Sequence, residues 1–262
     1  MERISVFLAD WQVLFREGIH FTLSGEEDME VIGEDTGNGQ ALAFIETNTP
    51  QVAILNANNH EKLSGIEATH HIKQNLPEVS VILVMDSDNE EQLFAAVKSG
   101  ASACLTKDVD PEVVVNTIRE VVQGSQPISE ALLRPEIASR VLGEFEVFAS
   151  IGEQVGKLLA HLAPRETEIL RHIAEGSARE QMAKTLEISE EAISHKLQSI
   201  LHKLVANEHK LRLLEAAQGG LPGTSRIGFS GKPGVEYITK EEFTAFKESL
   251  RERFKSLSGE IS

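Results

Sequence analysis

Apolar runs and amphipathic segments alternate over the first 124 residues, and this alternation limits the fold of the 262-residue chain more than any other feature. The first run is continuously apolar, as in a strand buried on both faces of a sheet. Strands that alternate with helices predict an α/β domain with a doubly wound, five-stranded parallel sheet. We expect strands at 3–9, 29–33, 52–55, 79–84 and 103–105, and helices at 13–23, 39–46, 66–75, 90–99 and 111–123.

Polar and apolar side chains follow these expected strands. In a doubly wound sheet, ligands bind beyond the carboxyl ends of the strands. The relevant positions are Asp10, Asn56, Met85 and Lys107. This edge of the sheet is therefore the candidate functional site of the first domain.

Residues 162–218 predict an all-α domain with a helix-turn-helix. A first helix carries an apolar stripe from Leu162 to Ile173 and ends at Gly176, and a short second helix surrounds Met182. Ser189 is a good N-cap for a third helix, with Ala192 at its N3 position. We expect a separate fourth helix at 208–217. A helix pair with a free polar face fits the major groove of DNA, although a small helical bundle without nucleic acid fits the same pattern.

Several short motifs make this second domain similar to the LuxR-type helix-turn-helix of NarL/FixJ response regulators. They are Pro164-Arg165-Glu166-x-Glu168-Ile169-Leu170, Ala174-Glu175-Gly176, Ile188-Ser189-Glu190 and Ile200-Leu201-x-Lys203-Leu204. The resemblance implies DNA binding, with Ser194, His195 and Gln198 as candidate groove-facing residues and Lys196, His202 and Lys203 as candidate phosphate contacts.

The first domain resembles the receiver domain of the same family. The matching motifs are Leu8-Ala9-Asp10, Leu14-Phe15-Arg16-Glu17-Gly18, Pro50-x-Val52, Ser99-Gly100-Ala101 and Lys107-Asp108. A receiver accepts a phosphoryl group on an aspartate, assisted by a magnesium ion that acidic neighbours hold. The resemblance therefore implies a phosphorylation pocket at the carboxyl ends of the strands.

That pocket is degenerate in this chain. Asn56 stands at the position of the accepting aspartate, and an amide cannot serve as the acceptor. The acidic pair after the first strand is reduced to Asp10 and Trp11, and Met85 replaces the usual hydroxyl, whereas Lys107 remains. One carboxylate is too few for a hard cation. We predict a pseudo-receiver with no catalytic residue, cofactor or metal; phosphotransfer through another carboxylate is the alternative.

Trp11 and Met85 are expected to fill the unused pocket and hold one conformation. Alternatives are that Trp11 simply caps the surface, or that a small ligand replaces the phosphate. The histidines His60, His70 and His71 are not expected to form a metal site, because adjacent helical residues face different ways.

Charge and substitutions leave DNA binding open to a second interpretation. The chain has a net charge of −16, but residues 164–218 carry 8 basic and 9 acidic side chains and are close to neutral. Phosphate neutralisation supplies much of the affinity for nucleic acid, so we expect weak binding by a monomer and a homodimer as the working form. Ala192, Ser194 and Glu180 replace residues common in the family, so the alternative function is an adaptor whose helix-turn-helix binds a protein.

The remaining segments are a linker and a C-terminal tail. We expect domain boundaries at 1–124, 125–161, 162–218 and 219–262, with helix at 131–148 that continues through 151–162. The tail combines a Gly-rich connector with an amphipathic helix, a possible site for a protein partner, through Phe243, Phe246, Leu250, Phe254 and Leu257. One cysteine and no apolar run of membrane-spanning length predict a cytoplasmic protein.

Overall fold

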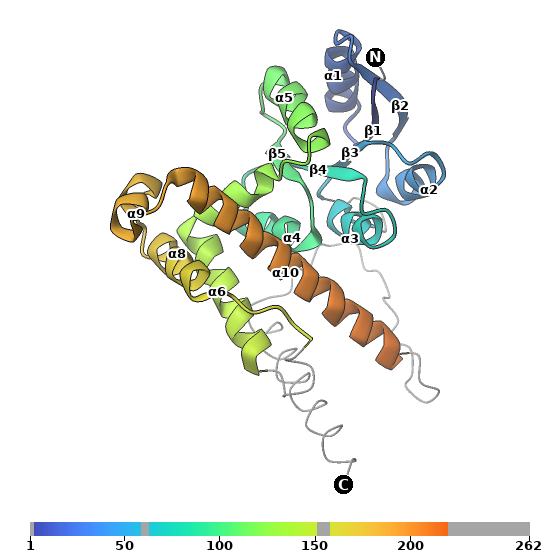
Figure 1. Cartoon of the computed structure of the whole chain (residues 1–262). Coiled ribbons are helices and arrows are strands. Elements are labelled where there is room, and N and C mark those ends of the chain that lie inside the picture. Colours follow the sequence, from blue (N-terminus) through green and yellow to red (C-terminus); the bar gives the residue numbers. More distant parts are fainter. Residues whose placement is uncertain (1–2, 59–62, 151–157, 220–262) are drawn as a thin grey trace.

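The computed structural model describes residues 3–58, 63–150 and 158–219 (Figure 1). Its first domain is a parallel sheet of order β2-β1-β3-β4-β5 with helices on both faces, which confirms the predicted fold class. The strands are β1 Ile4–Ala9, β2 Met29–Asp35, β3 Val52–Asn56, β4 Ser80–Met85 and β5 Ala103–Thr106. The helices are α1 Val13–Ser24, α2 Asn38–Asn48, α3 Gly65–Asn75, α4 Glu90–Ser99 and α5 Pro111–Val122.

Local sequence signals explain where these helices begin and end. The Ser64 hydroxyl accepts a hydrogen bond from the Glu67 amide, and Asn89 caps α4 in a similar way. These caps satisfy backbone donors that a helix leaves unpaired at its start. Gly100 ends α4 in the left-handed region at φ 85°, where a residue without a Cβ is favoured.

Two apolar layers lie on opposite faces of the sheet. One layer joins the sheet to α1 and α5 through residues such as Leu23 and Ile118. The other joins it to α2, α3 and α4 through residues such as Ile45, Ile72 and Val97. Successive side chains of a strand point to opposite faces of the sheet, so each strand contributes residues to both layers. The register aligns Ala9 with Leu55 and Asn56 with Val84, so the polar strand ends share one edge.

The linker folds as a 3-10 helix, η1 Pro127–Leu133, followed by α6 Pro135–Ser150. Helix was correctly expected around 131–148, but the expected continuation to residue 162 is wrong for the described part. Residues 158 and 159 form a turn and a bend, and residues 160–163 have no regular secondary structure. The residue before a proline is disfavoured in helical conformation, and Ala163 before Pro164 is extended, with ψ 154°.

The second domain contains α8 Pro164–Ala174, α9 Arg179–Leu186 and α10 Glu190–Gly219. The Ser189 hydroxyl accepts from the Ala192 amide at 3.1 Å, which confirms the expected N-cap. The expected break before a fourth helix is wrong, because α10 runs through it without interruption. Residues 204–208 contain neither Gly nor Pro, and the buried Asn207 amide bonds both the N–H and the C=O of Ala160.

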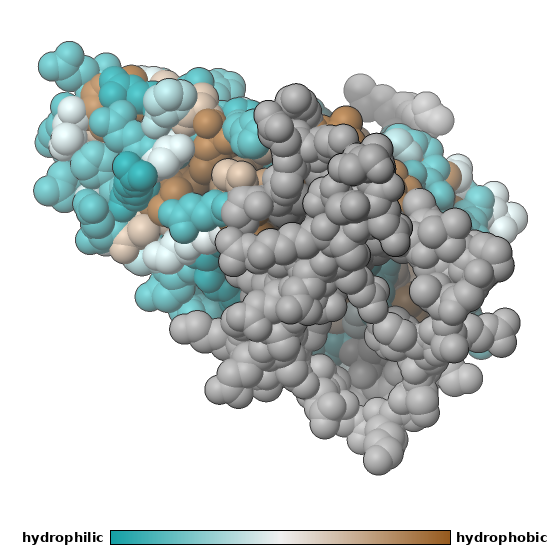
Figure 2. Space-filling view, turned by 90° about the horizontal axis from the view of Figure 1, so that it is seen from below, coloured by the Kyte–Doolittle hydropathy of each residue, from teal (hydrophilic) through white to brown (hydrophobic). Residues whose placement is uncertain are grey.

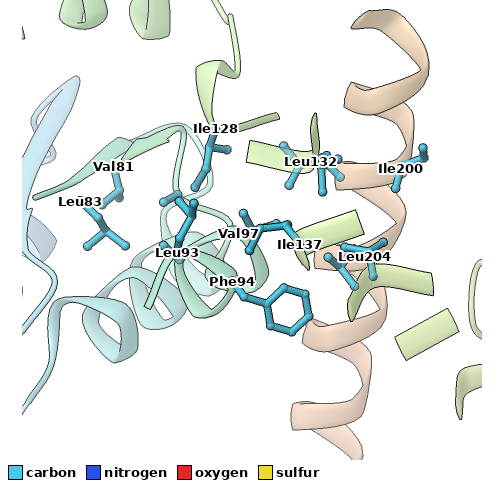
Figure 3. Packing of buried hydrophobic residues seen from close by; sticks show 14 of the residues in the cluster. Val81, Leu83, Leu93, Phe94, Val97, Ile128, Leu132, Ile137, Ile200 and Leu204 are labelled. Atoms are coloured by element: carbon cyan, nitrogen blue, oxygen red, sulfur yellow. The ribbon is translucent and has the colours of Figure 1, made fainter. Parts of the chain in front are cut away.

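The two domains share one continuous apolar core. Phe94 and Val97 of α4 face Ile137 of α6 and Leu204 of α10, and Leu93 lies on the side toward Val81 and Leu83 of the sheet (Figure 3). Lys98 adds ion pairs at 3.6 Å to Glu144 and at 3.0 Å to Glu208. α10 therefore lies across α4, and the helix-turn-helix domain is docked on the receiver-like domain through the linker.

The predicted tail helix lies outside the described residues. None of the helices in the described ranges is both long and apolar enough to cross a membrane.

Candidate phosphorylation pocket and nucleic-acid interface

The strand ends bring Asp10, Asn56 and Lys107 together in a polar network. Asn56 Nδ2 donates to Asp10 Oδ2 at 2.7 Å, and both residues are buried. Lys107 Nζ lies 2.9 Å from the same Asp10 oxygen. Asp10 Oδ1 also accepts from the Gln12 amide at 2.7 Å. Both oxygens of the buried Asp10 carboxylate are thus already bound by groups of the protein.

Three further residues complete this network, and the sequence analysis did not identify them. Lys107 Nζ lies 2.8 Å from Oδ1 of Asp86, the residue after β4. Asn58 Nδ2 donates to the other Asp86 oxygen at 2.9 Å, and Gln92 of α4 donates to Asn58. The Asp-Ser-Asp run after Met85 signalled acidic side chains at this strand end, but their direction depends on the loop conformation.

Trp11 and Met85 do not fill the pocket as expected. Trp11 is 42% exposed, and its ring lies at the pocket rim with its centroid 5.4 Å from Lys107 Nζ. Met85 is buried, but its side chain belongs to the apolar layer that includes Leu93 of α4. The pocket is instead occupied by its own polar side chains.

A magnesium ion does not fit these residues. A hard divalent cation needs several oxygen ligands, whereas the Lys107 ammonium already lies between the carboxylates of Asp10 and Asp86. The Asn56 amide points its nitrogen toward Asp10. An N–H group therefore lies where a metal ion would need an oxygen ligand. The described part of the chain contains no group of three or more His, Cys, Asp or Glu side chains suited to a metal. His70 and His71 lie in that part, whereas His60 lies outside the described residues.

The candidate DNA-reading face lies on the first half of α10. His195, Lys196 and His202 are exposed, while Ser194 and Gln198 are half-buried. Opposite them, Ile193, Leu197 and Leu201 are buried against α8 and α9. Seen from below, the end of the molecule that carries α8 and α9 is mainly hydrophilic (Figure 2). A polar face on a helix supported from behind is the arrangement that major-groove binding requires.

Lys203 differs from the other candidate phosphate contacts. Its Nζ donates to Glu166 Oε2 at 2.6 Å, and Glu166 is 2% exposed. Burial raises the pKa of Glu166, but hydrogen bonds from Lys203, Ala163 and Ser199 outweigh burial and leave that pKa below its usual value. Glu166 is therefore ionised, and Lys203 neutralises it within the core.

A receiver-like sheet joined to a helix-turn-helix defines a class of protein, the response regulators that control transcription. Residues 6–119 match the response regulator receiver domain, and residues 160–211 match the bacterial regulatory proteins of the luxR family. The chain thus combines a response regulator receiver domain with a luxR-type helix-turn-helix domain, and its homologues are response regulators that control transcription.

Curated relatives match over most of their length. The transcriptional regulatory protein DegU of Brevibacillus brevis is 27% identical over 83% of this chain and 94% of its own. The transcriptional regulatory protein YxjL of Bacillus subtilis is 29% identical over 84% and 98%. Among solved structures, the receiver domain of the response regulator NarL from Mycobacterium tuberculosis is 26% identical, with a TM-score of 0.46 over 47% of this chain and 99% of that chain.

Proposed function

We propose that this protein is a DNA-binding transcription regulator that is controlled independently of aspartate phosphorylation. Two contacts of Asp10 carry the proposal: the hydrogen bond from Asn56 and the ion pair with Lys107. An amide replaces the phosphoryl acceptor, and the one carboxylate beside it is bound from both sides. Phosphorylation would need a nucleophile and a cation site that these side chains do not offer.

The pocket network also supports a fixed rather than a switched state. In a receiver, the lysine and a hydroxyl read the phosphate, but here Lys107 is bound to Asp86. Asp86 is linked through Asn58 to Gln92, in the first turn of α4. On its other side, α4 packs on α10. Contacts with the pocket and contacts with the helix-turn-helix domain therefore both fix the position of α4.

In this proposal the regulator acts as a homodimer in the cytoplasm, and the helix predicted for the C-terminal tail binds a protein partner. The described charges support the dimer. The DNA-reading half of α10 carries two lysines. Lys203 forms an ion pair with Glu166, whereas Lys196 is exposed. One copy therefore offers few phosphate contacts, and two copies on one DNA site would double them.

DNA binding is tested by measuring affinity for genomic fragments over a salt series. Each lost phosphate contact should flatten the slope of log affinity against log salt by about one. Lys196→Ala should do so, whereas Lys184→Ala, on α9 and paired with Glu180, is the matched control. Gln198→Ala or Ser194→Ala should change sequence preference instead.

The ion pair between Lys203 and Glu166 favours the alternative function, an adaptor whose helix-turn-helix binds a protein, because it removes a candidate phosphate contact. That function replaces DNA binding if the wild-type chain binds no fragment even at low salt.

A further inference from the structure

Most basic side chains of the helix-turn-helix domain are paired with acidic residues of the same chain. Residues 164–203 contain six lysines and arginines. Four of them form ion pairs: Arg165 with Glu168, Arg179 with Glu130, Lys184 with Glu180, and Lys203 with Glu166. Only Arg171 and Lys196 lie outside the ion pairs of the described residues. The surface proposed to meet DNA therefore offers few permanent positive charges.

Two exposed histidines, His195 and His202, belong to the polar face of α10. No hydrogen bond or ion pair joins either side chain to another residue in the described part of the chain. The two residues are seven positions apart, about two turns of an α-helix, so they lie on the same side of α10. Histidine is the one side chain whose ordinary charge changes between about pH 5 and 8. These side chains therefore supply positive charge that depends on pH.

The permanent charges around this half of α10 leave a negative excess. Glu166 of α8, Glu180 of α9 and Glu130 of η1 belong to the ion pairs described above. The third histidine of the range, His172, is half-buried in the last turn of α8. The charges of residues 164–203 outside those ion pairs are two positive and four negative: Arg171, Lys196, Glu175, Glu187, Glu190 and Glu191. With neutral histidines, this surface therefore repels phosphate more than it attracts it.

Protonation of the two exposed histidines removes this negative excess. A protonated imidazole donates from both ring nitrogens and carries a positive charge, whereas the neutral ring has one donor and no charge. A nearby group of opposite charge favours the charged form of a side chain. A phosphate that binds beside a neutral histidine therefore draws a proton from the solvent to the imidazole, and the proton becomes part of the complex.

We propose that DNA binding by this chain takes up protons at His195 and His202, so that the helix-turn-helix domain binds DNA tightly only where both side chains are positively charged. The inference rests on the proposed function and adds the proton as a second ligand of the DNA contact. Control by pH acts at α10 itself and does not pass through the receiver-like pocket. Each protonated histidine supplies one phosphate contact that a neutral ring does not.

The test measures the affinity of the full chain for a fixed pool of sheared genomic DNA, over a salt series at two pH values. From about pH 8 to about pH 6, the affinity at low salt should rise by about tenfold or more, because two protons are taken up on binding. The salt slope should steepen by up to about two, one for each new phosphate contact. Equal affinity at both pH values would overturn the proposal and leave the proposed function standing. Absence of binding at every pH and salt would overturn both.

Paired substitutions assign the pH dependence to these two side chains, which are exposed and so can be replaced without loss of folding. His195→Gln combined with His202→Gln should bind weakly at both pH values and lose the pH dependence. His195→Lys combined with His202→Lys should bind at the higher pH about as tightly as wild type does at the lower pH. His71→Gln, on α3 and paired with Glu46, is the matched control and should keep the wild-type profile. A pH dependence that persists in the glutamine variant, or a lysine variant that gains no affinity at the higher pH, would overturn the proposal.

Discussion

Asn56 and Lys107 decide the character of the pocket at the scale of single residues. Asn56 can donate where an aspartate could only accept, so it forms a hydrogen bond with Asp10 instead of repelling it. Lys107 then balances Asp10 and Asp86. The resulting network is satisfied without any added ion.

Restoring the aspartate should therefore harm the protein rather than repair it. Asn56→Asp replaces a donor with a carboxylate beside Asp10, and like charges at such a distance disfavour each other. We expect a loss of about 1–3 kcal/mol in the free energy of unfolding at neutral pH, measured by urea denaturation. Asn116→Asp, on the exposed face of α5, is the control. Equal stability of Asn56→Asp and wild type would contradict this account of the network.

Sequence reasoning identified the pocket positions but not their contacts. The motifs located Asp10, Asn56, Met85 and Lys107 at strand ends, because strand position depends on local pattern. The ion pairs of Asp86 with Lys107 and of Glu166 with Lys203 join residues at least 21 positions apart. No local pattern records such partners, so Lys203 was expected to contact phosphate.

At the scale of elements, α10 determines how the domains meet. Its residues change role along the helix, from a candidate DNA-reading face near His195 to a packing face against α4 near Leu204. Helix periodicity predicted both halves, and the strands and helices of the first domain were predicted to within about two residues. Their fusion was missed because the choice between one helix and two depends on tertiary contacts, here those of Asn207 with Ala160.

Gly100 tests the contact between α4 and α10. A Cβ there would lie 3.1 Å from Cγ1 of Val205, and the backbone has φ 85°. Gly100→Ala should destabilise the protein by about 1–3 kcal/mol and speed amide hydrogen exchange in α10. Gly124→Ala is the control for backbone strain alone. Gly124 has φ 87°, but a Cβ there would meet no atom within 4 Å. If both variants exchange equally slowly in α10, the Val205 contact does not hold the helix.

At the scale of the whole molecule, an ionic cluster lies where the domains meet. Lys98 of α4 pairs with Glu144 of α6 and Glu208 of α10, and Arg212 pairs with Glu208. Burial, together with nearby Arg212, lowers the pKa of His70 to about 4 against the raising effect of Glu208. The interface thus holds His70 neutral.

This neutral histidine predicts that stability falls in acid. Between pH 6.5 and 4 the unfolded chain binds a proton at His70 that the folded chain does not, so stability decreases as pH falls through that window. The loss approaches about 3 kcal/mol at most. His70→Leu should flatten this dependence in urea unfolding, with His71→Leu, outside the interface, as control. An unchanged slope in His70→Leu would show that other groups cause the acid sensitivity.

The intact mass of the full chain, after incubation with acetyl phosphate and magnesium, tests most directly whether regulation is independent of phosphorylation. Asn56 cannot accept the phosphoryl group, and Asp10 is bound by Asn56 and Lys107. The account predicts a mass equal to that of the untreated protein. A stoichiometric phosphoryl adduct on residues 1–124 would contradict it.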